Sequence, residues 1–287
     1  TGSHQKDFWE FNPITGVFTQ KADFAGAERT FATSFSIGAF GYIGTGQTFF
    51  NVTLNDFWEY NPVTNTWLQK ASLPAIARYS AFGFSIGNKG YLGTGADNIN
   101  NVLGDFWEYN QATKTWIQKA SHPFARYAAV GFSIGNLGYM GTAPLNDFWE
   151  YNPVTDIWTQ KANFGGPGRS YATGFSIGNK GYLGTGTNGS VSFNDFWEYD
   201  VLTDTWTQKA HFIDGSPYGA VGFSIGSKGY IGTGFNGLFS NSMAEYRPDY
   251  NYLWSNGPVT QMMNTDSSGS YILKIANQMG CVNTSTA

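Results

Sequence analysis

The sequence predicts an all-β fold built from repeated sheets of short antiparallel strands, and two observations lead to this prediction. The pentapeptide Asp-Phe-Trp-Glu followed by an aromatic residue occurs five times, with its tryptophans 49, 49, 42 and 48 residues apart. A repeat of this length is typical of stacked supersecondary units. Glycine, asparagine and proline recur where tight hairpin turns need them, and no segment shows helical periodicity.

Each repeat divides into four expected strands. The first strand is Phe84–Ile86, and a glycine-bounded turn at 87–90 joins it to the second strand, Tyr91–Gly95. The third strand is Phe57–Tyr60 in the preceding copy of the pentapeptide, and the fourth is Thr66–Lys70. The other repeats carry the same four segments.

The third strand is apolar or aromatic on both faces, since Phe57 lies on one face and Trp58 and Tyr60 lie on the other. A sheet with one solvated face would instead alternate apolar and polar residues. Sheets of four strands that are buried on both faces and recur at a fixed spacing are the blades of a β-propeller. We therefore expect an all-β propeller of six blades, each with four antiparallel strands.

The two ends of the chain are expected to share one blade. Six pairs of third and fourth strands are present, the last in decayed form at 241–246, but there are only five pairs of first and second strands. Residues 1–255 are therefore assigned to the propeller, and the tail 256–287 is expected to supply strands at Val259–Met263 and Tyr271–Ala276. Alternatively, the tail begins another module and residues before Thr1 complete the blade, because Thr1-Gly2 matches the end of a second strand.

The repeated residues resemble a known family. A glycine-bearing second strand is followed by Asp-Phe-Trp-Glu-Tyr-Asn-Pro-x-Thr-x-x-Trp, as at 56–67, and then by a link rich in proline or glycine that leads to an arginine. This pattern covers residues 5–255 and resembles the kelch repeat of galactose-oxidase-like propellers, here of a bacterial secreted or surface type. One departure is Gly-Thr-Gly where the family has Gly-Gly. The resemblance implies a fold rather than one function, since kelch propellers include enzymes, adaptors and adhesive modules.

Loop lengths indicate which end of the propeller carries function. The hairpin turns within each blade have constant length, whereas the connections from second to third strand hold nine, nine, three, eight and seven residues. Variable loops on a constant scaffold commonly form binding sites. These loops are rich in amides and aromatic rings, which suit sugars or polar peptides, although ordinary solvated loops are the alternative. The candidate ligand-binding residues are Phe49, Phe50, Asp97, Asn98, Asn188, Phe235 and Phe239.

Four arginines recur six positions before the phenylalanine of the first strand and are further ligand-binding candidates: Arg29, Arg78, Arg126 and Arg169. Near the mouth of the central channel, their guanidinium groups would hold a carboxylate by bidentate hydrogen bonds. The alternative is that each arginine pairs with an aspartate of a neighbouring blade, such as Asp56 or Asp105, or with loop carbonyls. The glutamates of the third strands are expected to pair with lysines of the fourth strands.

Charge and composition argue against several classes of protein. With 16 basic and 20 acidic residues, the net charge of −4 provides no electrostatic footprint for nucleic acid. No apolar run approaches the roughly 18 residues of a membrane span, and the single cysteine forms no internal disulfide. We assign no catalytic residue, metal or cofactor, because hydrolase motifs are absent and the possible metal ligands are scattered. These ligands are His4, His122, His211 and Cys281.

The function that these observations favour is a non-catalytic propeller that binds a glycan or a surface protein on the variable-loop face. A structural subunit or spacer of an extracellular assembly is the second hypothesis, and a sugar isomerase or oxidase-like enzyme is the third. Low charge with abundant asparagine, threonine and glycine favours an extracellular or bacterial cell-surface location. The sequence leaves the ligand and the oligomeric state open.

Overall fold

The computed structural model describes residues 6–212, 214–240, 243–248, 254–256, 272–276 and 282–286, and every regular element among them is a β-strand. These residues therefore contain no helix that is long and apolar enough to cross a membrane. Five sheets hold four strands each, hydrogen-bonded in chain order. Their strands are β3 (Thr33–Ile37), β4 (Phe40–Gly44), β5 (Phe57–Asn61) and β6 (Thr66–Lys70); β7 (Phe82–Ile86), β8 (Lys89–Gly93), β9 (Phe106–Asn110) and β10 (Thr115–Lys119); β11 (Val130–Ile134), β12 (Leu137–Gly141), β13 (Phe148–Asn152) and β14 (Ile157–Lys161); β15 (Thr173–Ile177), β16 (Lys180–Gly184), β17 (Phe196–Asp200) and β18 (Thr205–Lys209); β19 (Val221–Ile225), β20 (Lys228–Gly232), β21 (Met243–Tyr246) and β22 (Trp254–Asn256).

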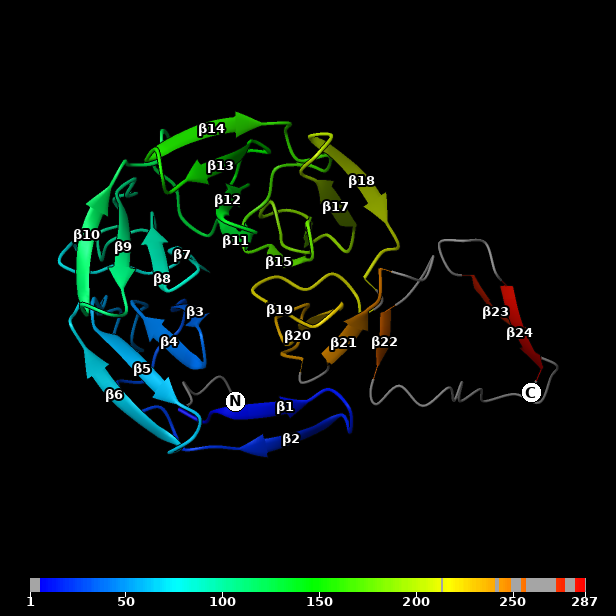
Figure 1. The fold of residues 1–287 in the computed structure, drawn as a ribbon, viewed down its shortest axis with the longest axis horizontal. Helices are drawn as coiled ribbons and strands as arrows, with labels where there is room; N and C mark the ends of the chain where they lie inside the picture. Colours follow the sequence, from blue (N-terminus) through cyan, green and yellow to red (C-terminus); the bar gives the residue numbers. More distant parts are fainter. Residues whose placement is uncertain are drawn as a thin grey trace.

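The five sheets are the blades of a β-propeller. All neighbouring strands within a blade pair antiparallel, for example Phe84 with Tyr91 and Leu92 with Trp107. The first strands β3, β7, β11, β15 and β19 contact one another in that order and surround the axis, and the fourth strands lie on the outside (Figure 1). The predicted all-β propeller is confirmed.

The second strand of each blade ends earlier than the sequence predicts. In the β7–β10 blade the prediction extends the strand to Gly95, but β8 ends at Gly93. The backbone then turns at Thr94 and Gly95, which have φ angles of 59° and 98°. Left-handed φ angles are incompatible with a pleated strand. Thr94 and Gly95 of the Gly-Thr-Gly sequence therefore begin the variable loop.

Aromatic side chains fill the space between neighbouring blades. Phe57 of β5 packs edge-on against Tyr109 and Trp116 of the next blade, with ring centroids 4.9 Å apart in both cases. The same arrangement recurs where Phe106 meets Tyr151 and Phe148 meets Tyr199 (4.8 Å each). Edge-to-face packing is the favoured geometry for aromatic pairs. One aromatic set per blade thus accounts for the composition.

Glycines on the inner strands receive a phenylalanine ring from the preceding blade. A Cβ atom built on Gly138 would come within 2.1 Å of the Phe84 ring, and one on Gly90 within 2.2 Å of the Phe35 ring. No side chain fits in that space. These glycines are therefore required by the close approach of the blades.

A half-blade lies between the first and last complete blades. Strands β1 (Trp9–Asn12) and β2 (Val17–Gln20) form a two-stranded sheet with the register of a third and fourth strand. The ring of Phe8 packs on Tyr60 at 4.7 Å, and that of Phe11 packs on Tyr230 at 5.4 Å. The hairpin thus occupies a sixth position in the ring (Figure 1).

The prediction of six four-stranded blades is wrong, because the described part of the chain forms five such blades. Strand β23 (Ile272–Ala276) pairs with β24 (Val282–Thr286) in a sheet of its own rather than with the half-blade. A local hairpin closes a short loop, whereas pairing with the N-terminal hairpin would close a loop of most of the chain. The strand predicted at Val259–Met263 lies outside the described residues. The assignment of 256–287 as a blade-completing tail stays a prediction.

Candidate functional site

The four repeated arginines are held inside their own blades. Each guanidinium group donates two parallel hydrogen bonds to an aspartate that precedes the third strand of the same blade. The pairs are Arg29 with Asp56, Arg78 with Asp105, Arg126 with Asp147 and Arg169 with Asp195. Bidentate pairing uses the donors that a ligand carboxylate would need.

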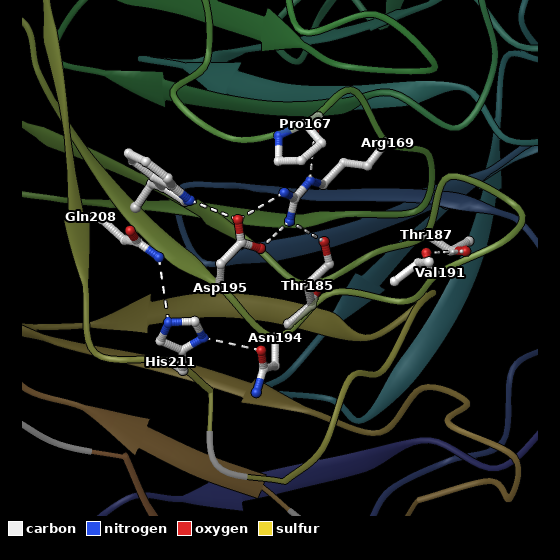
Figure 2. A network of polar contacts seen from close by, with 10 residues as sticks. Pro167, Arg169, Thr185, Thr187, Val191, Asn194, Asp195, Gln208 and His211 are labelled. Carbon is white, nitrogen blue, oxygen red and sulfur yellow. Dashed lines mark hydrogen bonds and ion pairs between the residues drawn. The ribbon is translucent and has the colours of Figure 1, made fainter.

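Figure 2 shows this arrangement for Arg169, which also donates to the carbonyl oxygens of Thr185 and Pro167, each at 3.0 Å. Asp195 receives a further hydrogen bond of 2.8 Å from the indole nitrogen of Trp197. The arginine side chain is fully buried. Each arginine thus pairs with an aspartate, as the alternative hypothesis states. That hypothesis expected an aspartate of a neighbouring blade, whereas the structure pairs each arginine with an aspartate of its own blade.

Electrostatics keep the aspartates ionised. Burial alone would raise the pKa of Asp105, but the hydrogen bonds and the charge of Arg78, together with the indole of Trp107, lower it below the ordinary value. The pKa values of Asp56, Asp147 and Asp195 are lowered in the same way. Each arginine therefore has its charge neutralised locally.

The glutamates of the third strands form ion pairs with lysines of neighbouring strands. Glu59 contacts Lys70 of the fourth strand at 2.7 Å, as expected. Glu108 instead contacts Lys89 of the second strand at 2.6 Å and accepts a hydrogen bond of 2.9 Å from the hydroxyl of Tyr91. The sequence pattern did not distinguish these two lysines, because both neighbour the same strand.

The variable loops carry the most exposed aromatic residues of the predicted site. The side chains of Phe49 and Phe50 are 67% and 83% exposed, and their rings meet edge to face at 5.4 Å. Phe239 is also exposed and packs against the half-buried Phe235 at 5.1 Å. These pairs come from different loops on the same end of the propeller.

The polar loop candidates differ in orientation. The carboxylate of Asp97 is buried and accepts hydrogen bonds from the main-chain N–H groups of Ile99 and Asn101, so it shapes its own loop. The side-chain oxygen of Asn188 accepts from the main chain of Val191 in a similar turn, although the residue is exposed. Asn98 is exposed at the tip of its loop.

Sequence reasoning missed a group of aromatic residues on the propeller axis. One aromatic residue follows the arginine position by one or two residues in every complete blade. We call these residues the axial aromatics: Phe31, Tyr79, Tyr127, Tyr171 and Tyr218. Their recurrence in all five repeats was the signal that would have identified them. The alternation between two positions concealed it.

The backbone at and next to the axial aromatics forms a series of hydrogen bonds from one blade to the next. The N–H group of Ser80 donates to the carbonyl of Phe31 at 3.0 Å, and that of Ala128 donates to Ser80 at 2.8 Å. Tyr171 and Gly219 continue the series at 2.9 and 3.0 Å. Phe31, Ser80, Ala128, Tyr171 and Gly219 all have φ angles between 52° and 64°. Residues other than glycine rarely adopt such angles. We call these five residues the axial collar.

The two histidines that the structure describes have different surroundings and share no contact. His122 is buried between Trp149 and Trp158, and its pKa is lowered to about 4, chiefly by burial. His211 is exposed and contacts Asn194 and Gln208 (Figure 2). His4 and Cys281 lie outside the described residues. Among those that are described, no three His, Cys, Asp or Glu side chains gather as a metal site would require.

The fold defines the class of protein as a β-propeller with five four-stranded blades and an additional half-blade. No protein-family model matches the sequence. No curated protein matches it either. The kelch and galactose-oxidase-like relationship therefore stays a prediction from the repeat.

Proposed function

We propose that this chain is a non-catalytic binding module that recognises a glycan or a surface protein through its variable-loop face. The observation that carries the proposal is the exposed ring pair of Phe49 and Phe50 on a loop whose length differs between blades. Aromatic residues held at a surface are common anchors in binding sites. The repeated arginines are not part of this proposal, because their donors are bound within the blades.

Loop geometry supports the proposal. Gln47, just before the exposed pair, bridges to Thr30 at the entrance of the inner strand and to Thr53 across the loop. The N–H group of Gly46 donates to the carbonyl of Arg78 in the next blade at 2.8 Å. The loop bases are thus fixed to the scaffold, while their tips project. A surface or extracellular location, inferred from composition, belongs to the same proposal.

A glycan array and a pull-down from surface-protein extracts test the proposal. The variant Phe49→Ser/Phe50→Ser removes the exposed rings from the variable-loop face. The matched control is Ile14→Ser, which removes an exposed apolar residue from the turn between β1 and β2 on the opposite face. We expect these experiments to identify a ligand that binds to the wild type and to the Ile14→Ser control but not to the double variant. The absence of any ligand, or equal loss in the control, would contradict the proposal.

A further inference from the structure

The axial aromatics bring five rings from five blades together at the centre of the variable-loop face. Phe31 lies 5.5 Å from Tyr171, which belongs to a blade three positions further along the ring, and 6.1 Å from Tyr79 of the next blade. Tyr127 lies 6.4 Å from Tyr79, and Tyr218 lies 6.4 Å from Tyr171. The rings therefore form one continuous aromatic surface across the axis.

This surface is partly open, in contrast to the aromatic packing between blades. Phe31 is 47% exposed and Tyr127 is 41% exposed, whereas the strand residues Tyr91 and Tyr139 are fully buried. The axial collar fixes the backbone beneath the rings by hydrogen bonds between blades. A rigid surface of this kind loses little conformational entropy on binding.

The charged groups that lie next to Tyr79 in the chain or in its neighbouring loop are bound to other partners. The arginine next to Tyr79, Arg78, is bound to Asp105, and the carboxylate of Asp97 is turned to its own loop. The hydroxyl of Tyr79 donates a hydrogen bond of 2.7 Å to the amide oxygen of Asn100. An uncharged ligand with hydroxyl groups suits this setting better than an anion.

The hydroxyl groups of Tyr171 and Tyr79 stay protonated. Burial raises the pKa of Tyr171 above its ordinary value; a hydrogen bond with Ser80 opposes this shift, and the nearby tyrosine rings add to it. Burial likewise raises the pKa of Tyr79, with contributions from Tyr127 and Asp97. At neutral pH these groups are thus neutral donors and acceptors beside the open rings.

We propose that the axial aromatics bind a neutral β-linked gluco-oligosaccharide, which names a ligand class for the variable-loop face and rests on the function proposed above. In such a sugar the hydroxyl groups are equatorial, so both faces of each ring present C–H groups. These faces stack on Phe31 and Tyr127, while the equatorial hydroxyls hydrogen-bond with tyrosine hydroxyls and with the amides of Asn98 and Asn100. Stacking on rings combined with amide hydrogen bonds provides both affinity and orientation.

Calorimetric titration with cellohexaose, and with the anionic hexagalacturonate for comparison, tests the proposal. The test variant is Phe31→Ala/Tyr127→Ala; alanine already stands in the axial collar at Ala128 with a similar φ angle. The matched control is Phe18→Ala on β2, since Phe18 is also 41% exposed but lies on the outer side of the half-blade. Near-ultraviolet circular dichroism establishes that all variants are folded.

We expect saturable binding of cellohexaose by the wild type, at least tenfold weaker binding by the double variant and no change in the control. Lack of saturation by the wild type, preference for hexagalacturonate, or equal weakening in the control would overturn the proposal. If cellohexaose fails but another ligand depends on Phe49 and Phe50, the axial site alone is wrong. If no ligand depends on either set of rings, the proposed function fails as well.

Discussion

Arg78 donates hydrogen bonds of 2.6 and 2.7 Å to the two carboxylate oxygens of Asp105, and the arginine side chain has no exposed surface. The pair joins the entrance of the first strand to the entrance of the third strand in one blade. The fifth complete blade has Pro217 and Ser242 at these two positions, so both partners are replaced together. Loss of the pair as a unit agrees with a structural role.

Removal of one partner is expected to be costly. Arg78→Met leaves the carboxylate of Asp105 without its cation, and breaking a buried pair in this way costs about 3–5 kcal/mol. The double variant Arg78→Met/Asp105→Ser is expected to lose less than the sum of the two single variants, because no unpaired charge is left. Urea denaturation of the three variants measures this. Additive losses would show that the two residues act independently.

Acid is expected to destabilise the propeller through the same aspartates. The folded-state pKa of Asp105 is lowered below its ordinary value of 3.8, as are those of its three counterparts. A lowered pKa contributes stability that is present above the unfolded-state value and is lost as the pH falls through the folded-state value. Melting temperatures should therefore decline below about pH 4. A flat profile from pH 5 to pH 2 would contradict this.

Replacement of His122 by phenylalanine is expected to stabilise the protein. The other repeats have Phe24, Leu73, Phe164 or Phe212 at this position, all buried. Burial lowers the pKa of His122 from 6.5 to about 4; the charge of Arg126 also lowers it, while the contacts with Phe124 and Asp147 oppose the shift. The wild type therefore loses stability as the pH falls from 6.5 toward 4, by up to about 3 kcal/mol.

Thermal unfolding of His122→Phe and of the wild type at about pH 7.5 and about pH 4.5 measures this effect. The aspartates destabilise both proteins equally in acid, so the difference between the two proteins comes from His122. The gain in melting temperature should be larger at the lower pH. Phe164→His serves as the reverse variant and should introduce the same dependence in the next blade. Equal gains at both pH values would show that His122 does not titrate on unfolding.

The incomplete sixth position is expected to make one inner strand tolerant of substitution. Ile134 of β11 is 5% exposed, whereas the equivalent Ile225 of β19 is 40% exposed. Ile134→Ala should cost about 2–5 kcal/mol, while Ile225→Ala should cost about 1 kcal/mol or less. Chemical denaturation of both variants compares identical substitutions at equivalent places. Similar losses would indicate that β19 is covered in solution.

The sequence indicates which loops form the candidate site, but it does not indicate which side chains of those loops face solvent. The variable loops and the exposed Phe49 and Phe50 followed from loop lengths. Asp97 and Asn98 are neighbouring polar residues of one variable loop, and both were ligand-binding candidates. In the structure Asn98 is exposed, whereas Asp97 is buried and bound within its own loop. The direction of a side chain in an irregular loop depends on which main-chain N–H groups it meets, and sequence spacing does not specify these.

The sequence by itself determined the repeat, the antiparallel strands and the aromatic set between blades, because local turn chemistry and alternation along a strand depend on near neighbours. Only the tertiary structure decided that five blades are complete and that β23 pairs with β24. The tertiary structure also showed that the arginine donors bind groups of their own blades and that the Phe31 ring lies against the Tyr171 ring across the axis. The contact between Phe31 and Tyr171 joins two different blades, so it forms only when the blades close around one another, whereas each arginine pair forms within a single folded blade.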